Sequence, residues 1–588
     1  MKDRTRQAQE TERVLQGTAV SRGIGIAPVH VVARGFSAPE VYPITDVEAE
    51  QARFENALAV TRGQLSELQK RIEAISGEHE SRIFEAHLMM IEDKAIVDRV
   101  NEAIAERKQN AEFALYAVAQ NFLEAMRRVP DPYLRERTTD IEDVCQRVLR
   151  NFSHEDQRDG HPSDNHILVA YDLSPSDTAS MDRRHLHGFA TEMGSVNSHT
   201  AILARSLGIP AIVGLQGAVL EVRALTPAII DGYTGKLILN PTPETFARYE
   251  RVRTEKERVR HKLEAQRNDE AVTTDGRRIT LSANIELVKE LPFVKHSGAR
   301  GVGLYRTEFL LLEGEQIPGE DFQARTYTQL ARALAPDPVI IRTLDSGGDK
   351  LPVEPLLEPE PNPFLGWRGI RVSLDRPAMF KEQLRAILRA SAHGKVAVMF
   401  PLVSGIMEVR RAKDLVKEAM DELAAKNIPF DENIDIGVMI ELPSAAIIAD
   451  LLAPEVDFFS IGTNDLIQYT VAADRVNYRV ADLYRPTHPA VIRLIKRTID
   501  AAIQNGIWTG VCGEMAGDVR LTPLLLGLGV EELSVGPHQV PRVRHAIRAL
   551  SHAECAAMAD EALRTPLSKD TLELTTELAT KYYRDLID

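Results

Sequence analysis

The spacing of apolar residues divides the chain into a helical part and a longer part in which strands alternate with helices. Between Asp46 and about Asn151, Ala52, Leu58 and Leu65 recur at near-helical spacing, and this pattern predicts a bundle of helices. From His166 to Asn240 the pattern changes to short apolar strands separated by short helices. These strands are expected at Ile167–Ala170, Gly188–Thr191, Ala211–Val213, Ala228–Ile230 and Lys236–Leu239. We interpret them as an α/β unit that apolar strands near the N-terminus complete and into which the bundle is inserted.

Beyond Thr273 the chain repeats a strand followed by helical sequence eight times. The predicted strands are Ile279–Asn284, Gly301–Tyr305, Val339–Leu344, Val396–Pro401, Ile436–Glu441, Phe458–Gly462, Trp508–Cys512 and Glu532–Val535. Eight such units predict a (β/α)₈ barrel. The stretch from Glu244 to Asp269 is highly charged and has little apolar surface, so we expect an exposed helix that links two bodies.

Composition narrows the classes of function. The 588 residues fit about three domains of roughly 100–200 residues each. A net charge of −15 argues against binding to nucleic acid or anionic membranes, which requires basic patches. The three scattered cysteines form neither a disulfide framework nor a zinc-binding pattern. We find no signal peptide and no apolar run long enough to span a bilayer, so a cytoplasmic location is expected.

Charged or reactive residues stand where the predicted barrel strands end. In chain order they are Arg306, Arg342, Glu441, Asn464-Asp465 and Cys512. Any one of them could belong to a structural ion pair, but Arg and Glu are rarely buried without a partner or ligand. Active residues of such barrels lie at the C-terminal ends of the strands. The whole set therefore predicts a binding site at that end.

The residue types at these strand ends suit a small phosphate-bearing anion. Arginine offers fork-shaped donors to phosphate or carboxylate oxygens. Two neighbouring carboxylates, Glu441 and Asp465, predict a Mg²⁺ site completed by substrate and water oxygens. Cys512 lies between glycines at a strand end. A buried cysteine is usually inert core, but here we expect access to the ligand and a thiol that donates a proton to an enolate carbon.

A second candidate lies in the α/β unit, at His199. Residues 200–207 have a helical pattern that Gly208 closes, so Ser198 is a natural N-cap and His199 stands at the helix start. Backbone amides and the helix dipole favour an anion there, such as a phosphorylated imidazole. Arg205 could add a cation. A lone histidine is more often structural, but the helix start and the arginine together favour a functional one.

Several long strings give the chain a family resemblance. Its sequence from about Gln16 onward resembles Enzyme I of the bacterial phosphotransferase system, the phosphoenolpyruvate–protein phosphotransferases. The strings that carry the resemblance are Ser198–Gly214, Gly303–Phe309, Arg342–Lys350, Asn362–Arg368, Glu441–Ser444, Asp457–Gln468 and Gly510–Gly517. Because these strings are long, chance similarity is improbable.

The resemblance implies a role for each matched residue. His199 matches the histidine that is phosphorylated on Nε2, and Thr178 matches a residue that hydrogen-bonds that histidine; Arg205 is kept as a supporting cation because of its position in the predicted helix. Arg306, Arg342, Asn464 and Arg475 match phosphoenolpyruvate ligands, to which Lys350 and Arg368 are added as further candidates. Glu441 and Asp465 match Mg²⁺ ligands, with Asp465 also near the substrate. Cys512 matches the residue that protonates the enolpyruvate carbon.

The resemblance also implies a domain division and partners. The expected α/β phosphohistidine domain comprises residues 14–40 and 153–241, with an inserted helical domain at 41–152 that binds a small histidine phosphocarrier protein. A linker helix is expected at 242–270, and a barrel at 271–588 that binds phosphoenolpyruvate and forms a homodimer. The motif before His199 departs from the family, with Ser195 in place of a glycine and Asn197 in place of a threonine. We expect altered tuning there and no loss of activity.

Two other functions remain open at this point. Pyruvate–phosphate dikinases and phosphoenolpyruvate synthases share the histidine and barrel modules, but they carry a large ATP-binding region for which this chain has neither the length nor a Gly-rich loop. A non-catalytic regulatory scaffold could retain the fold. The intact set of arginines, carboxylates, cysteine and histidine argues against that scaffold.

Overall fold

The computed structural model covers the chain as two compact units, Met1–Glu257 and Arg258–Asp588. The described residues are 11–32, 38–76, 87–91, 93–127, 132–152, 164–171, 173, 185–194, 204, 208–215, 222–308, 310, 318–346, 360, 362–475, 477 and 479–587.

The first unit contains an eight-stranded sheet with the order β1-β8-β7-β3-β4-β5-β6-β2. Its strands are β1 Arg13–Gln16, β2 Thr18–Ser21, β3 Ile24–Val32, β4 His166–Ala170, β5 Leu186–Thr191, β6 Ala211–Val213, β7 Pro227–Asp231 and β8 Lys236–Leu239. The N-terminal strands pair with later ones: β3 runs antiparallel to β7 on one side and parallel to β4 on the other. The central strands β4, β5 and β6 are parallel and almost wholly buried. This agrees with their near-continuous apolar sequence.

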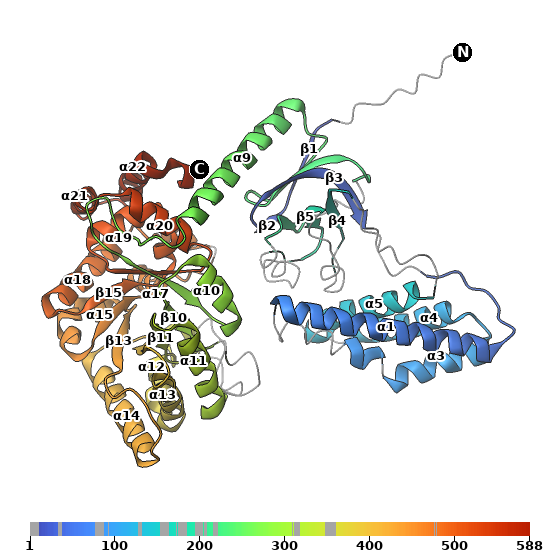
Figure 1. Ribbon diagram of the computed structural model, residues 1–588, viewed down its shortest axis with the longest axis horizontal. Coiled ribbons are helices and arrows are strands. Elements are labelled where there is room, and N and C mark those ends of the chain that lie inside the picture. Colours follow the sequence, from blue (N-terminus) through green and yellow to red (C-terminus); the bar gives the residue numbers. More distant parts are fainter. Residues whose placement is uncertain are drawn as a thin grey trace. The chain divides into compact units, whose positions relative to one another are not determined.

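Between β3 and β4 the chain forms a bundle of helices, drawn in blue in Figure 1. The described helices are α1 Val47–Ser76, α3 Lys94–Arg107, α4 Ala111–Arg127 and α5 Pro132–Arg150. Their apolar faces form two clusters, and in the larger one Phe54, Ile104 and Leu115 are almost fully buried. The ring of Phe54 stacks on Phe152 with centroids 6.3 Å apart.

The helix α9, Pro243–Ala265, contains the boundary between the two units. Most of its residues are exposed, but two apolar side chains are buried. Tyr249 is buried against Ile229 and Ile238 of the sheet, and Val259 is buried in the core of the second unit. Each of these contacts is made by a single apolar residue of the helix. One such residue is too few to produce an amphipathic pattern in the sequence.

The second unit is a closed barrel with the order β10-β11-β12-β13-β14-β15-β16-β9. Its strands are β9 Thr280–Ile285, β10 Val302–Arg306, β11 Val339–Arg342, β12 Val396–Phe400, β13 Asp435–Ile440, β14 Phe458–Ile461, β15 Trp508–Val511 and β16 Glu532–Val535. Every neighbouring pair is parallel. The predicted (β/α)₈ barrel is therefore confirmed, and each predicted strand overlaps an observed one.

Helices surround the barrel (Figure 1). They are α10 Leu291–Ser297, α11 Glu320–Leu334, α12 Ile370–Asp375, α13 Pro377–Ser391, α14 Ile406–Ala425, α15 Pro443–Ile447, α16 Ala449–Leu452, α17 Thr463–Val471, α18 Pro489–Asn505, α19 Thr522–Leu528, α20 Val540–Ala549, α21 His552–Ala562 and α22 Ser568–Ile587. Short 3₁₀ turns are η1 Val288–Glu290, η3 Pro363–Leu365, η4 Ala453–Glu455, η5 Ala481–Leu483 and η6 Glu514–Gly517. Alternate strand residues face the helices or the barrel interior, where Met399, Met439 and Phe458 are buried.

No helix within the described ranges is both long enough and apolar enough to cross a lipid bilayer.

Candidate functional site

The residues predicted from the strand ends come together at the C-terminal end of the barrel. Arg306 and Arg342 are the last residues of β10 and β11. Glu441 directly follows β13, and Cys512 directly follows β15. In a closed parallel barrel the C-terminal ends of all strands meet on one face. These side chains therefore share one site, although the first, Arg306, and the last, Cys512, are 206 residues apart in the sequence.

Arg342 is held by carboxylates within the wall of the barrel. It is almost fully buried, and its guanidinium makes a close ion pair with Glu308. Its Nη1 lies 3.2 Å from Oδ2 of Asp345. Burial by itself would lower the pKa of Arg342, but the charges of Glu308 and Asp345 raise that pKa above its ordinary value. The arginine therefore stays charged while it is withdrawn from solvent.

Arg368 is fully buried at this site, with 0% of its surface exposed. Its Nη2 lies 3.2 Å from Asp345 and 3.3 Å from Asp465. Its Nη1 donates a hydrogen bond to the hydroxyl of Tyr469 at 3.0 Å. Arg368 follows the η3 turn and does not end a strand. It joins the loop after β11 to the helix after β14.

Three carboxylates gather beside these arginines. Asp345, Glu441 and Asp465 are all buried, and each offers an oxygen within 4.8 Å of the other two. The backbone N–H of Leu402 donates to Oε1 of Glu441 at 2.6 Å, which orients that carboxylate. Hard oxygen donors of this kind fit Mg²⁺ and suit a soft metal poorly. The residues present therefore fit a divalent cation that is bound with substrate or water oxygens.

Two buried guanidinium donors point to an additional ligand. Within the described part of the chain, the Nε atoms of Arg342 and Arg368 have no hydrogen-bond acceptor. A buried donor left without a partner costs about 1–3 kcal/mol, so it is retained where something outside the protein supplies the acceptor. Donors beside a carboxylate cluster suit an anion that binds together with a cation.

Asn464 and Arg475 flank the carboxylates. Asn464 lies in the first turn of α17, and its side-chain oxygen accepts the backbone N–H of Glu514 at 2.9 Å. Nη1 of Arg475 lies 3.5 Å from Oδ1 of Asp465. Both side chains are thus adjacent to the predicted metal ligands. The amide of Asn464 is already occupied by a loop contact.

Arg306 is the more accessible of the two strand-end arginines, with 34% of its side chain exposed. Its Nη1 lies 2.7 Å from Oε1 of Glu286. Glu290 lies close by and accepts the backbone N–H of Glu286 at 3.3 Å. Burial raises the pKa of Glu290 to about 7. Arg306 thus has a carboxylate partner at the edge of the site that a ligand could replace.

Cys512 is buried, with 3% of its surface exposed, so the expectation of an accessible thiol is corrected. Its Sγ lies 3.7 Å from the carbonyl oxygen of Ile461. Burial raises the pKa of Cys512 to about 11, while a hydrogen bond with Ser460 and the charge of Arg342 act in the opposite direction. A thiol in this state carries its proton at neutral pH. That is the form needed by an acid and not by a nucleophile.

Four predicted site residues lie outside the described residues, namely His199, Thr178, Arg205 and Lys350. The same holds for the departures Ser195 and Asn197 and for the predicted helix at 200–207, of which only Ala204 is described.

Asp345, Glu308 and Tyr469 were not predicted from the sequence as site residues. Asp345 lies three residues after Arg342 in the string Arg342–Lys350, and the spacing Arg-x-x-Asp was the available signal. Tyr469 gave no signal, because its partner Arg368 is 101 residues away in the sequence.

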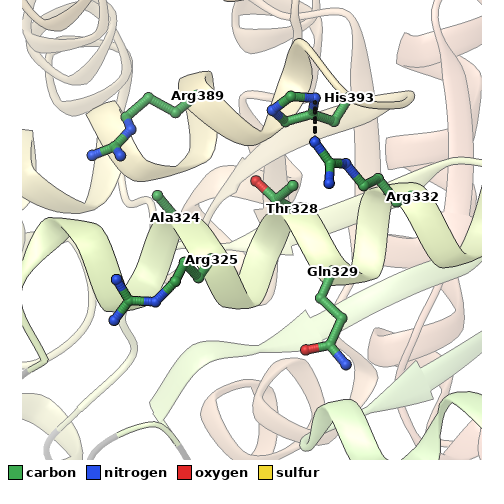
Figure 2. Close-up of a pocket in the computed structure, with 7 residues that line it drawn as sticks. All are labelled: Ala324, Arg325, Thr328, Gln329, Arg332, Arg389 and His393. Atoms are coloured by element: carbon green, nitrogen blue, oxygen red, sulfur yellow. Dashed lines mark hydrogen bonds between the residues drawn. The ribbon is translucent and has the colours of Figure 1, made fainter.

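The chain also has a basic cleft that is separate from this site. A cavity of about 410 Å³ between α11 and α13 is lined by Arg325, Arg332, Arg389 and His393 together with Ala324, Thr328 and Gln329. Figure 2 shows Arg332 donating to the ring of His393. Arg332 and Arg389 lie in the last turns of their helices, where a cation complements the helix dipole. Because barrel helices run opposite to the strands, these ends lie away from the strand ends that carry Arg342.

Comparisons with known proteins agree with the geometry. Three family models match: "PEP-utilising enzyme, N-terminal" at residues 16–137, "PEP-utilising enzyme, mobile domain" at 162–235 and "PEP-utilising enzyme, PEP-binding domain" at 260–552. A curated "Phosphoenolpyruvate-protein phosphotransferase" of Staphylococcus carnosus is 40% identical over 96% of this chain and 98% of its own.

Further relatives have the same name or a related title. The "Phosphoenolpyruvate-protein phosphotransferase" of Listeria innocua is 42% identical over 97% of this chain and 99% of its own length. Among solved structures, an "NMR solution structure of Enzyme I (nEIt) protein" is 33% identical and covers 41% of this chain and 99% of that one, with a TM-score of 0.34.

Proposed function

The chain belongs to the phosphoenolpyruvate–protein phosphotransferase family, and we propose that it moves a phosphoryl group from phosphoenolpyruvate to His199 and then to a histidine of a small phosphocarrier protein. The observation that carries this proposal is the buried arginine and carboxylate cluster at the C-terminal end of the barrel. Among the described residues, the Nε–H donors of Arg342 and Arg368 have no hydrogen-bond acceptor, and such donors suit a substrate rich in anionic oxygens.

In the proposed mechanism the arginines bind and orient the substrate. Arg306 exchanges its exposed contact with Glu286 for a substrate oxygen. Arg342 and Arg368 offer N–H donors, and the ion pairs with their carboxylate partners fix the orientation of both guanidinium groups. Because phosphoryl transfer depends mainly on alignment and charge stabilisation, fixed guanidinium groups supply most of what the protein must contribute. Asn464, Arg475 and Lys350 are proposed to complete the substrate contacts.

We propose that the cation of this site is Mg²⁺. Glu441 and Asp465 would hold it, and the structure adds Asp345 as a third carboxylate within reach. When bound, Mg²⁺ would neutralise charge on the phosphoryl oxygens. In the described residues, Arg342 and Arg368 neutralise part of the carboxylate charge.

The proposed bond changes involve the imidazole of His199 and the thiol of Cys512. Nε2 of neutral His199 attacks phosphorus, the N–P bond forms, and the P–O bond to the enol oxygen breaks. The released enolate takes a proton on its methylene carbon from the thiol of Cys512, which yields pyruvate. A thiol with a pKa near 11 holds its proton until a strongly basic carbon is presented to it. Thr178 and Arg205 are proposed to support the phosphorylated imidazole.

The two reacting parts belong to different units, with His199 in the first and the arginines in the second. We therefore propose that the α/β domain, residues 14–40 and 153–241, moves as a body toward the barrel and then toward the carrier. The linker, residues 242–270, which contains α9, is the proposed hinge region. The inserted domain, 41–152, is proposed to bind the carrier, and the barrel, 271–588, to form a cytoplasmic homodimer.

Labelled phosphoenolpyruvate with Mg²⁺ tests the proposal directly. We expect one acid-labile phosphoryl group per chain in the wild type and none in His199→Ala. His187→Ala is a matched control on β5 and is expected to label fully. Uptake by His199→Ala equal to that of the wild type would refute the scheme.

A second pair of variants tests the barrel site. We expect Arg342→Lys to lose labelling, because lysine has a single ammonium group in place of the planar fork. Arg332→Ala, in the basic cleft, is the matched arginine control and should label at the wild-type rate. Equal labelling by the two variants would show that phosphoenolpyruvate binds elsewhere.

A further inference from the structure

A buried glutamine on the outside of the barrel connects the two strand ends that carry Arg306 and Arg342. Gln383 lies in α13 and is almost fully buried. Its Oε1 accepts the backbone N–H of Leu344 at 3.0 Å. Its Nε2 donates to the hydroxyl of Thr307 at 3.3 Å. Thr307 directly follows Arg306, and Leu344 lies between Arg342 and Asp345.

The strand ends are also linked directly. The hydroxyl of Thr307 donates to the carbonyl oxygen of Arg342 at 2.9 Å. One hydroxyl therefore accepts from Gln383 and donates to Arg342, and one side-chain amide contacts both segments. We call Thr307, Leu344 and Gln383 the Gln383 bridge.

The bridge continues outward through a chain of hydrogen bonds in which each donor is used once. The second N–H of the Gln383 amide donates to the hydroxyl of Tyr327 at 3.3 Å. That hydroxyl donates to Oε1 of Gln323 at 3.0 Å. Nε2 of Gln323 donates to the carbonyl oxygen of Pro318 at 2.7 Å. Because hydroxyl and amide roles agree at every link, the amide of Gln383 has only one orientation that satisfies its neighbours.

The surroundings leave the bridge little freedom to rearrange. The cavity beside it, lined by Thr307, Leu344 and Gln383 among others, has a volume of about 10 Å³. That is no more than a single water requires. Thr307 and Tyr327 are buried to within 1% of their surface. If Gln383 loses its hydrogen bond to Thr307 or Leu344, the strand ends themselves therefore have to move.

We propose that Gln383 and Thr307 are positioning residues that fix the separation of Arg306 and Arg342 and thereby set the affinity for the phosphate-bearing substrate. The inference rests on the proposed function, because it takes these arginines as substrate ligands. Neither residue touches the substrate. Both act through the backbone of the segments that present the guanidinium groups.

The alternative is that the network only stabilises the fold. Tyr327 separates the two explanations, since its hydroxyl belongs to the network and contacts neither strand end. Loss of that hydroxyl leaves the contacts of Gln383 with Thr307 and Leu344 in place. Tyr327→Phe is thus a matched control for lost stability without lost positioning.

The experiment measures Kd for phosphoenolpyruvate with Mg²⁺ by calorimetry in a His199→Ala background, where no turnover occurs. KM and kcat for pyruvate release are measured in the otherwise wild-type chain with an excess of a small histidine phosphocarrier protein as the phosphoryl acceptor. Gln383→Met removes all polar contacts at similar volume, and Thr307→Val removes only the hydroxyl. We expect Gln383→Met to raise Kd and KM about tenfold or more, with kcat changed less. Thr307→Val should give a smaller rise in the same direction.

Tyr327→Phe should lower the melting temperature and leave Kd and KM within about twofold of the wild type. The inference is overturned if Gln383→Met binds as tightly as its parent, or if Tyr327→Phe weakens binding as much as Gln383→Met. A wild-type chain that binds phosphoenolpyruvate but releases no pyruvate would refute the proposed function instead. The Kd series would still decide the positioning role.

Discussion

Replacing Glu532 by glutamine should make the barrel more stable at pH 8 and change its dependence on pH. Glu532 opens β16 and faces the barrel interior, where only 5% of its surface is exposed. The hydroxyl of Ser282 donates to its carboxyl group. Burial raises the pKa of Glu532 to about 7, and the hydrogen bond from Ser282 offsets only part of that rise. The carboxyl group inside the barrel is therefore uncharged at pH values well below 7.

Two glycines make room for this carboxyl group. A Cβ built on Gly510 would lie 2.8 Å from Oε2 of Glu532, and one on Gly303 would lie 2.9 Å from Oε1. Any larger residue at either position would displace the acid, so the carboxyl group is packed as closely as an apolar side chain.

The magnitude follows from linkage between protonation and folding. In the unfolded chain Glu532 titrates near its model value of 4.5, whereas in the folded chain it titrates at about 7. Its contribution to stability is fully present below pH 4.5 and is lost as the pH rises through 7, because the folded state then has to hold a buried carboxylate. At about 1.4 kcal/mol per pKa unit, the whole effect is about 3 kcal/mol, of which about 2 kcal/mol falls between pH 5.5 and 8.

The assay is urea unfolding followed by tryptophan fluorescence. The chain contains two tryptophans, Trp367 and Trp508, and both belong to the second unit. Glu532→Gln keeps the volume and an acceptor for Ser282 but has no charge to bury. We expect its stability relative to the wild type to increase by about 2 kcal/mol between pH 5.5 and 8. Glu290→Gln is made alongside it and should show a separate pH-dependent gain, because burial also raises the pKa of Glu290 to about 7.

Two outcomes would contradict the assignment of this pH dependence to Glu532. If the difference in unfolding free energy between Glu532→Gln and the wild type were constant across this pH range, the buried carboxyl group would not titrate as described. If Glu290→Gln removed the whole pH dependence of the wild type, Glu290 and not Glu532 would be its source.

Three further predictions concern the candidate site. Cys512→Ser should slow pyruvate formation about 10²-fold or more when a phosphocarrier protein is present as the phosphoryl acceptor, because a hydroxyl is a poorer proton donor to carbon, while thermal melting should stay close to wild type. Arg368→Met should cost about 3–5 kcal/mol of stability, since it removes the buried cation that pairs with Asp345 and Asp465, and calorimetric melting would detect this. Chelation of divalent cations should abolish labelling of His199, and Mg²⁺ should restore it better than Ca²⁺, because Ca²⁺ takes longer and more numerous ligand bonds.

Much of the barrel could be predicted from sequence for a simple reason. Its strands are buried on both faces and therefore read as short, nearly continuous apolar runs. The rule that active residues lie at C-terminal strand ends then selected Arg306, Arg342, Glu441 and Cys512 without any knowledge of side-chain contacts.

The remaining parts depend on tertiary contacts that leave no local pattern. Gln383 and Tyr327 occupy ordinary helix positions, and their roles come from partners 76 and 56 residues from Gln383 along the chain. Glu532 begins a strand, where a charged residue would ordinarily be read as exposed. The side chain of Glu532 lies in the interior only because the barrel closes, with β16 paired to β9.

The two kinds of buried acid in this barrel show what distinguishes a binding site from a core. Glu532 and Asp345 are about equally withdrawn from solvent, so burial alone does not separate them. Glu532 has a hydroxyl as its hydrogen-bonding partner and responds to burial by holding its proton. Asp345 has two guanidinium groups beside it, and its charge contributes to raising the pKa values of both arginines. Ionised arginines and carboxylates are therefore kept at the C-terminal strand ends, whereas the acid inside the barrel holds its proton. A phosphate and a divalent cation can bind to these separate positive and negative groups.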